Sequence, residues 1–204
     1  MTAPVDLVLF DIGGVLGSNG WDREQRTAAV EKFQLDADDF QYRHEETAGA
    51  LESGQITLDE YLDVTALCSA PSFSRAEFKA FMFAQSVPWP RSIAVARALA
   101  GRGTVRMATL NNESAELNEF RIQHFGLGGI FTTFFTSCWL GVRKPMLEIY
   151  ERVLGMTQAD PQRTVFVDDR VQNLTPAAGL GVKTIHFQNV EQLERDLRAY
   201  GLLD

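Results

Sequence analysis

Four charged residues have the types and positions that phosphate chemistry requires: Asp11, Lys144, Asp168 and Asp169. The aspartates directly follow short apolar runs, and the lysine precedes a helical pattern that leads into the later run. Hard cations such as Mg²⁺ prefer oxygen ligands, and a carboxylate beside such an ion can attack phosphorus as a nucleophile. A lysine can neutralise phosphate charge as a point cation. These residues favour transfer of a phosphoryl group to an aspartate, assisted by Mg²⁺.

The elements that must position these residues alternate along the chain. Short apolar runs bounded by turn residues predict buried strands over 5–10, 105–110, 134–137, 164–167 and 183–187. Helical patterns lie between most of them, over 92–100, 114–125, 145–154, 171–178 and 190–199, with Pro145 at the expected first helical position. Alternating strands and helices predict an α/β fold with a mostly parallel sheet. Ligands bind beyond the carboxyl ends of such strands, where Asn111 and Asn112 also lie.

The stretch between the first and second predicted strands differs from the rest. Helical patterns run over 23–33 and 38–52, and two capping boxes, at Thr57 and Ser74, each open a further apolar helical run. No convincing strand pattern occurs there. We therefore predict an α/β core over 1–16 and 87–204, interrupted by a helical insertion over 17–86.

The sequence resembles the haloacid dehalogenase-like (HAD) superfamily of hydrolases. The matching motifs are FDIGGVL, TLNN, GVRKP and VFVDDRVQN, which occur in the family's order and span most of the core. The resemblance implies a Rossmann-like three-layer core, with the insertion as a small helical cap of the C1 type. The cap stretch LESGQIT and the sequence RKP followed by Ile149 and Tyr150 are similar to subfamily I, in its branch of epoxide-hydrolase N-terminal phosphatases and glucose-1-phosphate phosphatases.

The resemblance also implies roles for single residues. Asp11 corresponds to the nucleophile and a metal ligand, and Lys144 to the lysine that binds phosphate. Asp169 corresponds to the direct metal ligand, and Asp168 to a direct or water-mediated partner. Asn173 matches a position that steadies the loop or the lysine. These roles predict an aspartyl-phosphate intermediate and Mg²⁺ as the cofactor.

Two positions depart from the family's pattern. Gly13 stands where a second aspartate usually gives its backbone carbonyl to Mg²⁺ and its side chain as general acid and base. Asn111 stands where a Ser or Thr contacts the phosphoryl group, and its amide can donate a hydrogen bond too. With Gly14, Asn112 and Lys144 these residues complete the expected substrate-binding set. Positioned acid–base catalysis contributes ~10²–10⁴-fold, so we expect slow turnover or a preference for good leaving groups.

Composition narrows the range of partners. Nineteen Lys and Arg against 27 Asp and Glu give a net charge of −8 in 204 residues, with no basic run. Such a chain is not expected to bind nucleic acid, which repels negative charge and requires a basic surface. No apolar run approaches the length of a membrane span. Two distant cysteines and an N-terminus unlike a signal peptide favour a cytoplasmic protein.

The sequence leaves several alternatives open. The favoured substrate is a small phosphorylated metabolite, a sugar phosphate being one candidate. The alternatives are a 2-haloacid dehalogenase, which would use the same aspartate without a metal, and a phosphate-binding relative with little turnover. A monomer and a homodimer are both compatible with the sequence. For His44 in the predicted cap, a structural role is favoured over contact with substrate.

Overall fold

The computed structural model describes residues 4–69 and 72–204. Its sheet has five strands, β1 (Leu7–Phe10), β2 (Arg106–Asn111), β3 (Thr133–Thr136), β4 (Thr164–Asp168) and β5 (Lys183–His186). They pair in the order β3-β2-β1-β4-β5, and every pair is parallel. The α/β fold with a mostly parallel sheet is therefore confirmed, and β1 lies at its centre.

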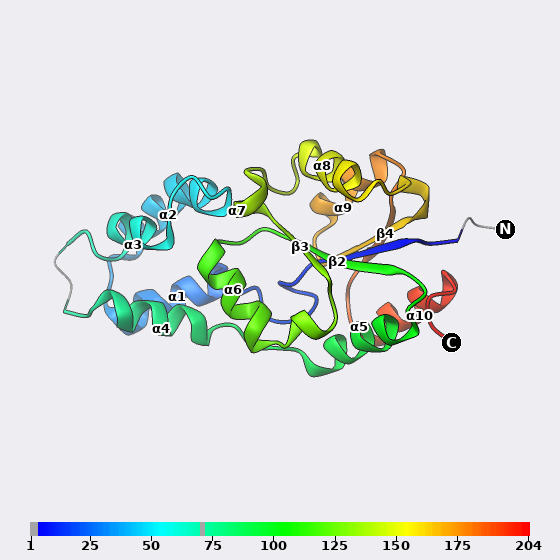
Figure 1. Cartoon of the computed structure of the whole chain (residues 1–204). Helices are drawn as coiled ribbons and strands as arrows, with labels where there is room; N and C mark the ends of the chain where they lie inside the picture. Colours follow the sequence, from blue (N-terminus) through cyan, green and yellow to red (C-terminus); the bar gives the residue numbers. More distant parts are fainter. Residues whose placement is uncertain (1–3, 70–71) are drawn as a thin grey trace.

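Helices cover both faces of the sheet, giving three layers (Figure 1). One face carries α5 (Pro90–Arg102) and α10 (Val190–Ala199), and the other carries α8 (Leu147–Thr157) and α9 (Val171–Gly179). The remaining core helices are α6 (Ala115–His124), α7 (Ser137–Leu140), and the 3₁₀ turns η1 (Leu127–Gly129) and η2 (Pro161–Arg163).

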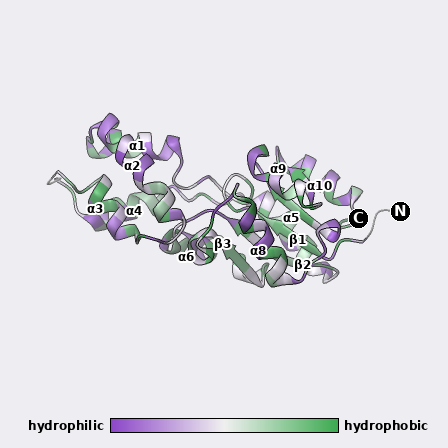
Figure 2. Ribbon diagram, turned by 90° about the horizontal axis from the view of Figure 1, so that it is seen from above, coloured by the Kyte–Doolittle hydropathy of each residue, from purple (hydrophilic) through white to green (hydrophobic). Residues whose placement is uncertain are grey.

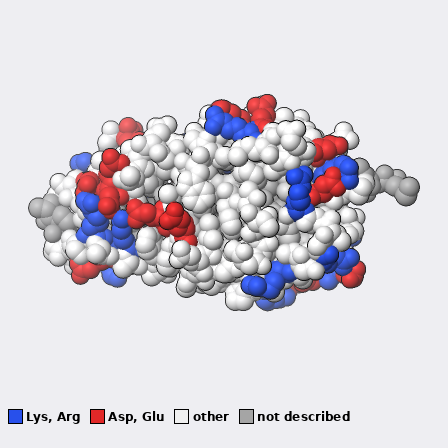
Figure 3. All heavy atoms as spheres, viewed as in Figure 1, with Lys and Arg blue, Asp and Glu red and all other residues white. Residues whose placement is uncertain are grey.

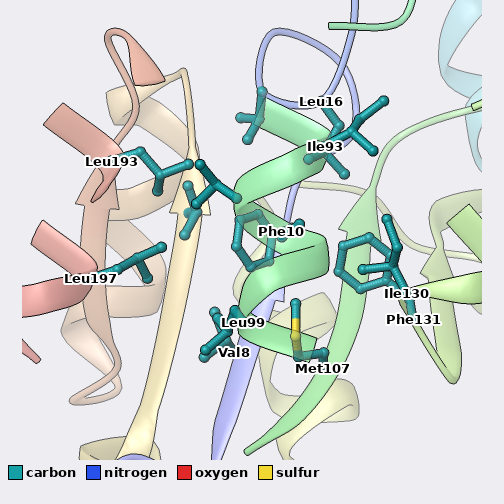
Figure 4. Close-up of a cluster of buried hydrophobic side chains, with 14 of the residues drawn as sticks. Val8, Phe10, Leu16, Ile93, Leu99, Met107, Ile130, Phe131, Leu193 and Leu197 are labelled. Atoms are coloured by element: carbon teal, nitrogen blue, oxygen red, sulfur yellow. The ribbon is translucent and has the colours of Figure 1, made fainter. Parts of the chain in front are cut away.

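The central strand is apolar on both sides because both faces of the sheet are covered. Phe10 packs with Leu99 of α5 and Leu193 of α10 in one cluster (Figure 4). Leu9 packs with Ile149 of α8 in the cluster on the opposite face. Successive side chains of a strand point to opposite faces, so this run fixes β1 between two helical layers and leaves Asp11 at its carboxyl end.

Between β1 and α5 the chain forms α1 (Arg23–Phe33), α2 (Ala37–Glu52), α3 (Leu58–Thr65) and α4 (Arg75–Ala84). We call these helices the four-helix insert. It extends from one end of the sheet, away from both chain termini (Figure 2). A separate cluster of buried residues, including Phe40, Tyr61 and Phe78, holds it together. Both predicted capping boxes are present, at Thr57 and Ser74.

The predicted start of the helix after Lys144 is wrong. Pro145 lies in a turn, and α8 begins at Leu147. The Met146 N–H donates to the Arg143 carbonyl at 2.9 Å, and Met146 is in the extended region as the N-cap. The turn therefore delays the helix by two residues and keeps Lys144 in an irregular segment.

The helix lengths, the surface charges and the cysteines do not indicate a particular function. In the parts of the chain that the structure describes, every helix is too short or too polar to cross a bilayer. On the face seen in Figure 3, Lys and Arg side chains alternate with Asp and Glu over the insert. Both cysteines are free.

Candidate active site

The carboxyl ends of the central strands bring the predicted aspartates together. Asp11 follows β1 directly, and its backbone N–H donates to the Val167 carbonyl of β4 at 2.9 Å. Asp168 is the last residue of β4. One carboxylate oxygen each of Asp11, Asp168 and Asp169 lies within 4.8 Å of the others. The parallel register between β1 and β4 thus produces a cluster of three carboxylates from two sequence-distant segments.

Lys144 lies against this cluster and is itself buried. Its Nζ is 3.0 Å from Asp11 Oδ2 and 2.6 Å from Asp168 Oδ2, and it donates to the Leu110 carbonyl at 3.0 Å. Burial lowers the pKa of Lys144, but the charges of Asp11 and Asp168 outweigh it and raise the pKa above its ordinary value. The lysine is therefore a fixed cation beside the candidate nucleophile.

The two adjacent aspartates have different environments. Asp168 is fully buried, and its oxygens accept hydrogen bonds from Lys144, the Arg170 N–H and the Asn173 amide. By contrast, Asp169 Oδ1 is buried without a hydrogen-bond partner among the described residues. Buried polar atoms are rarely left in this state without an ion or water to satisfy them. Asp169 is thus the carboxylate with a free ligand position.

The cluster carries more negative charge than Lys144 can balance. The pKa of Asp11 is raised to about 7, by burial first and by Asp168 and Asp169, although Lys144 opposes the shift. Burial and Asp168 also raise the pKa of Asp169. Three oxygen ligands close together, one of them orphaned, form a donor set that fits Mg²⁺, which prefers carboxylates and water.

Gly14 makes room for this arrangement. Its φ is +70°, and a Cβ on it would lie 2.3 Å from Asp169 Oδ2. Its N–H donates to the Gly17 carbonyl at 2.8 Å, so the turn itself uses that donor. The predicted contact between Gly14 and substrate stays a prediction, while its lack of a side chain is required by Asp169.

We expect Gly14→Ala to weaken Mg²⁺ binding at least tenfold, because the new methyl group would displace the Asp169 carboxylate. Gly103→Ala is the matched control, since Gly103 has a φ of +63° and open space around it. Both variants carry the same backbone strain, so a loss confined to Gly14→Ala isolates the effect on the ligand. Calorimetric titration with Mg²⁺ measures it, and equal affinities in both variants would contradict the assignment of Asp169.

The side chains of the two asparagines at the end of β2 form hydrogen bonds with other residues of the protein. The Asn111 amide donates to Asn118 Oδ1 at 2.9 Å and accepts from Thr136 Oγ1 at 3.4 Å. The Asn112 amide donates to the Lys144 carbonyl and accepts from the Lys144 N–H, both at 2.8 Å. Asn112 therefore holds the backbone of Lys144, and the predicted contacts of both asparagines with substrate stay predictions.

Sequence reasoning missed an ion pair beside Gly13. A Cβ on Gly13 would lie 3.7 Å from Arg121 Nη1 and 3.3 Å from Asn19 Oδ1. Arg121 is buried, donates to the Ser18 carbonyl, and pairs with Glu113 at 3.4 Å. Burial raises the pKa of Glu113 to about 7, and Arg121 opposes this shift. The position of Glu113, directly after Asn112 at a strand end, was the available signal.

A cavity of about 340 Å³ opens at this cluster. Its wall includes Asp11, Lys144 and Asn173 from the core, Trp21 from the segment before α1, and Arg26, His44 and Glu52 from the four-helix insert. The volume suits a small ligand. The structure brings together Asp11, Gly13, Asn112, Lys144 and Asn173 on the wall, whereas Asn111 is not part of it. His44, for which the sequence favours a structural role, also lies on this wall, and that role stays a prediction.

Comparison with known proteins agrees with these features. A family model described as haloacid dehalogenase-like hydrolase matches residues 5–181. The sesquiterpene phosphatase astK of Aspergillus oryzae is 31% identical over 100 residues, covering 49% of this chain and 50% of that protein. The bifunctional epoxide hydrolase 2 of Rattus norvegicus is 30% identical over 207 residues, covering 94% of this chain and 36% of that protein. The chain thus spans half the length, or less, of these relatives.

Solved structures share the fold at low identity. A HAD family enzyme from Bacteroides thetaiotaomicron, crystallised with magnesium and inorganic phosphate, superposes with a TM-score of 0.78 at 24% identity, covering 90% of this chain and 94% of that one. An L-2-haloacid dehalogenase superposes with a TM-score of 0.68 at 20% identity, covering 96% of this chain and 99% of that one. The fold is therefore common to phosphate-binding and dehalogenating enzymes.

Proposed function

The chain belongs to the haloacid dehalogenase-like hydrolase family, and on that premise we propose that it is a Mg²⁺-dependent phosphohydrolase of small phosphate monoesters. One observation carries the proposal. Lys144 Nζ lies 3.0 Å from Asp11 Oδ2, beside a carboxylate cluster in which Asp169 Oδ1 has no partner. This arrangement combines a nucleophile, a cation suited to phosphate and a set of oxygen ligands suited to a metal ion. A phosphatase among the relatives supports it.

In the proposed reaction, the Asp11 carboxylate attacks phosphorus. A bond forms between the carboxylate oxygen and phosphorus while the bond between phosphorus and the leaving oxygen breaks, and water then hydrolyses the aspartyl phosphate. The Ile12 N–H holds Asp11 Oδ1 at 2.8 Å, which orients the carboxylate. Lys144 stabilises the charge of the phosphoryl oxygens. Asp11, Asp168, Asp169 and the Gly13 carbonyl would hold Mg²⁺, which supplies further positive charge to these oxygens.

In this proposal the insert acts as a cap over the core. Ion pairs join the two parts, Arg170 with Asp22 at 2.6 Å and Arg143 with Glu52 at 3.0 Å. Residues 17–86 would then admit a compact substrate and exclude water during transfer. Both ion pairs are solvent-exposed, and exposed ion pairs are individually weak. Opening of the cap would therefore break only weak contacts at Arg143 and Arg170.

The test is phosphate release from a panel of phosphorylated metabolites with and without Mg²⁺, beside chloride release from 2-chloropropionate. We expect phosphate release that requires Mg²⁺, fastest with acyl phosphates and p-nitrophenyl phosphate because Gly13 supplies no acid. Chloride release without Mg²⁺ would contradict the proposal and support a dehalogenase. Tight phosphate binding with no turnover across the panel would support the non-catalytic alternative.

Restoring a carboxyl at position 13 tests the missing acid. We expect Gly13→Asp to raise kcat for alkyl phosphates relative to p-nitrophenyl phosphate by about tenfold. This gain is below the full effect of acid catalysis, because Arg121 would hold the new carboxyl ionised. Gly13→Asn is the control of equal size without an acid, measured in steady-state kinetics. The same gain in Gly13→Asn, or none in Gly13→Asp, would contradict the interpretation.

A further inference from the structure

The charged residues on the cavity wall are paired, with one exception. Among the described residues of the wall, four ion pairs have N···O distances within 4.0 Å. They are Lys144 with Asp11, Arg121 with Glu113, Arg143 with Glu52, and Arg170 with Asp22. Arg26 of α1 also lines the cavity, but no described carboxylate lies within ion-pair distance of it. Arg26 is therefore the one cation of the wall without an ion pair to a described residue.

Arg26 is only 9% exposed. Its Nε donates to Gln41 Oε1 at 3.3 Å and its Nη1 to the Trp21 carbonyl at 2.9 Å, both neutral acceptors. Its Nη2 makes no hydrogen bond to the described residues. Burial lowers the pKa of Arg26, although Tyr61, Asp22 and Glu45 raise it. A buried cation without an ion-pair partner is costly, and a ligand anion would reduce that cost.

His44 of α2 supplies a second donor on the same wall. Its Nδ1 lies 2.9 Å from Tyr61 Oη, which also accepts from Trp21 Nε1 at 2.9 Å. Indole N–H can only donate, so Tyr61 Oη accepts from Trp21 and its own proton is available to His44 Nδ1. In the tautomer that accepts this proton, His44 carries its proton on Nε2, for which the described residues offer no hydrogen-bond partner. Burial, and next Arg26, lower the pKa of His44 to about 4, so the ring is neutral near pH 7.

We propose that Arg26 and His44 form a second anion subsite, which binds an oxyanion at the end of the substrate remote from the phosphate that reacts at Asp11. This inference rests on the proposed function and narrows its substrate class. The substrate would be a small phosphate monoester that also carries a carboxylate or a second phosphate. Guanidinium and imidazole N–H groups bind carboxylates and phosphates alike. The test therefore uses one pair of substrates for the carboxylate and another pair for the second phosphate.

The first experiment uses the wild-type protein and matched substrates. 3-Phosphoglycerate differs from glycerol 3-phosphate by a carboxylate, and fructose 1,6-bisphosphate differs from fructose 6-phosphate by a phosphate. In at least one pair, we expect the substrate with two anionic ends to have a kcat/KM at least tenfold higher, mainly through KM. The preferred pair identifies the oxyanion. Equal kcat/KM values within both pairs would overturn the proposal.

The second experiment removes the cation. Arg26→Gln should lower kcat/KM for the preferred substrate by ~10–100-fold, as expected for a lost charged hydrogen bond. The two substrates of the pair should then have similar kcat/KM values. Arg26→Lys should keep part of the preference. Arg43→Gln is the control, because Arg43 is another arginine of the insert, paired with Asp39 at 2.8 Å and absent from the cavity wall. An equal loss for both members of the pair in Arg26→Gln would show a structural role and overturn the subsite.

Binding without turnover separates this proposal from the proposed function. The matched pairs can be titrated by calorimetry into the Asp11→Asn variant with Mg²⁺ present, with and without Arg26→Gln. Tighter binding of the ligand with two anionic ends, lost with Arg26→Gln, supports the subsite even if no substrate is hydrolysed. Hydrolysis of p-nitrophenyl phosphate without any such preference would support the phosphatase and reject the subsite.

Discussion

Replacing Lys144 with methionine is expected to lower kcat/KM for p-nitrophenyl phosphate by about 10²–10³-fold, the usual effect of removing a donor that stabilises transition-state charge. Lys144 Nζ is the cation nearest to Asp11, and methionine keeps most of its apolar stem. Lys144 is almost fully buried, so its charge beside Asp11 is little screened by solvent.

The same variant should also lose stability when Mg²⁺ is absent. Lys144→Met leaves the buried carboxylates of Asp11 and Asp168 without their cation, and breaking a buried pair in this way costs ~3–5 kcal/mol. Mg²⁺ should restore part of the loss, since it compensates the same carboxylates. Thermal melts with and without Mg²⁺ measure both effects.

Lys32→Met is the control for this prediction, because Lys32 is an exposed lysine at the end of α1. It should change neither activity nor the response to Mg²⁺. Unchanged turnover in Lys144→Met, or equal melting temperatures in both variants, would contradict the role assigned to Lys144.

Replacing Asp11 with asparagine is expected to abolish phosphatase activity while stabilising the Mg²⁺-free protein at pH 8. An amide cannot act as the nucleophile, so we expect kcat to fall by at least ~10³-fold, in the range seen when nucleophiles are removed. Turnover of p-nitrophenyl phosphate at the wild-type rate would contradict the assignment of Asp11.

The stability effect follows from the raised pKa of Asp11, about 7 in the folded protein against 3.8 as the ordinary value. Between these pH values the folded state binds more protons than the unfolded state, so the free energy of unfolding falls as pH rises through this window. Asparagine removes this loss, which is largest above pH 7. Melting temperature should rise by roughly 2–4 °C for each kcal/mol regained.

A matched variant at the opposite end of β1 controls for charge removal. Asp6 is paired with Arg163 at 2.6 Å and is 39% exposed at its side chain. Asp6→Asn should leave activity unchanged. Mg²⁺ should also stabilise the wild type more than Asp11→Asn, because the variant lacks one ligand.

The fold and the charged centre of the site follow from local signals. The run before Asp11 and the run before Asp168 are apolar without interruption, which fits strands buried on both faces. Parallel strands place their carboxyl ends at one edge, so the aspartates had to meet once the sheet was recognised. Lys144 was found by motif order, although the turn at Pro145 that holds it was mistaken for the start of a helix.

The remaining wall of the cavity depends on tertiary packing. Arg26 lies on a helix that is polar on most sides, so its sequence does not show which side chains face a cavity in another part of the chain. Burial and the charge of Arg26, which lies on a different helix, keep His44 neutral. Arg121 reaches the space beside Gly13 from α6. The spacing of residues along the sequence does not reveal these contacts, because each joins segments that only the folded chain brings together.

Covalent transfer of the phosphoryl group to Asp11 is the central step of the proposed reaction. The direct measurement is an acid quench of the wild-type protein during turnover of p-nitrophenyl phosphate with Mg²⁺, followed by peptide mapping by mass spectrometry. We expect a phosphoryl group on the peptide that contains Asp11, removed by hydroxylamine and absent without Mg²⁺. Continued phosphate release with no modification of that peptide at any quench time would contradict it.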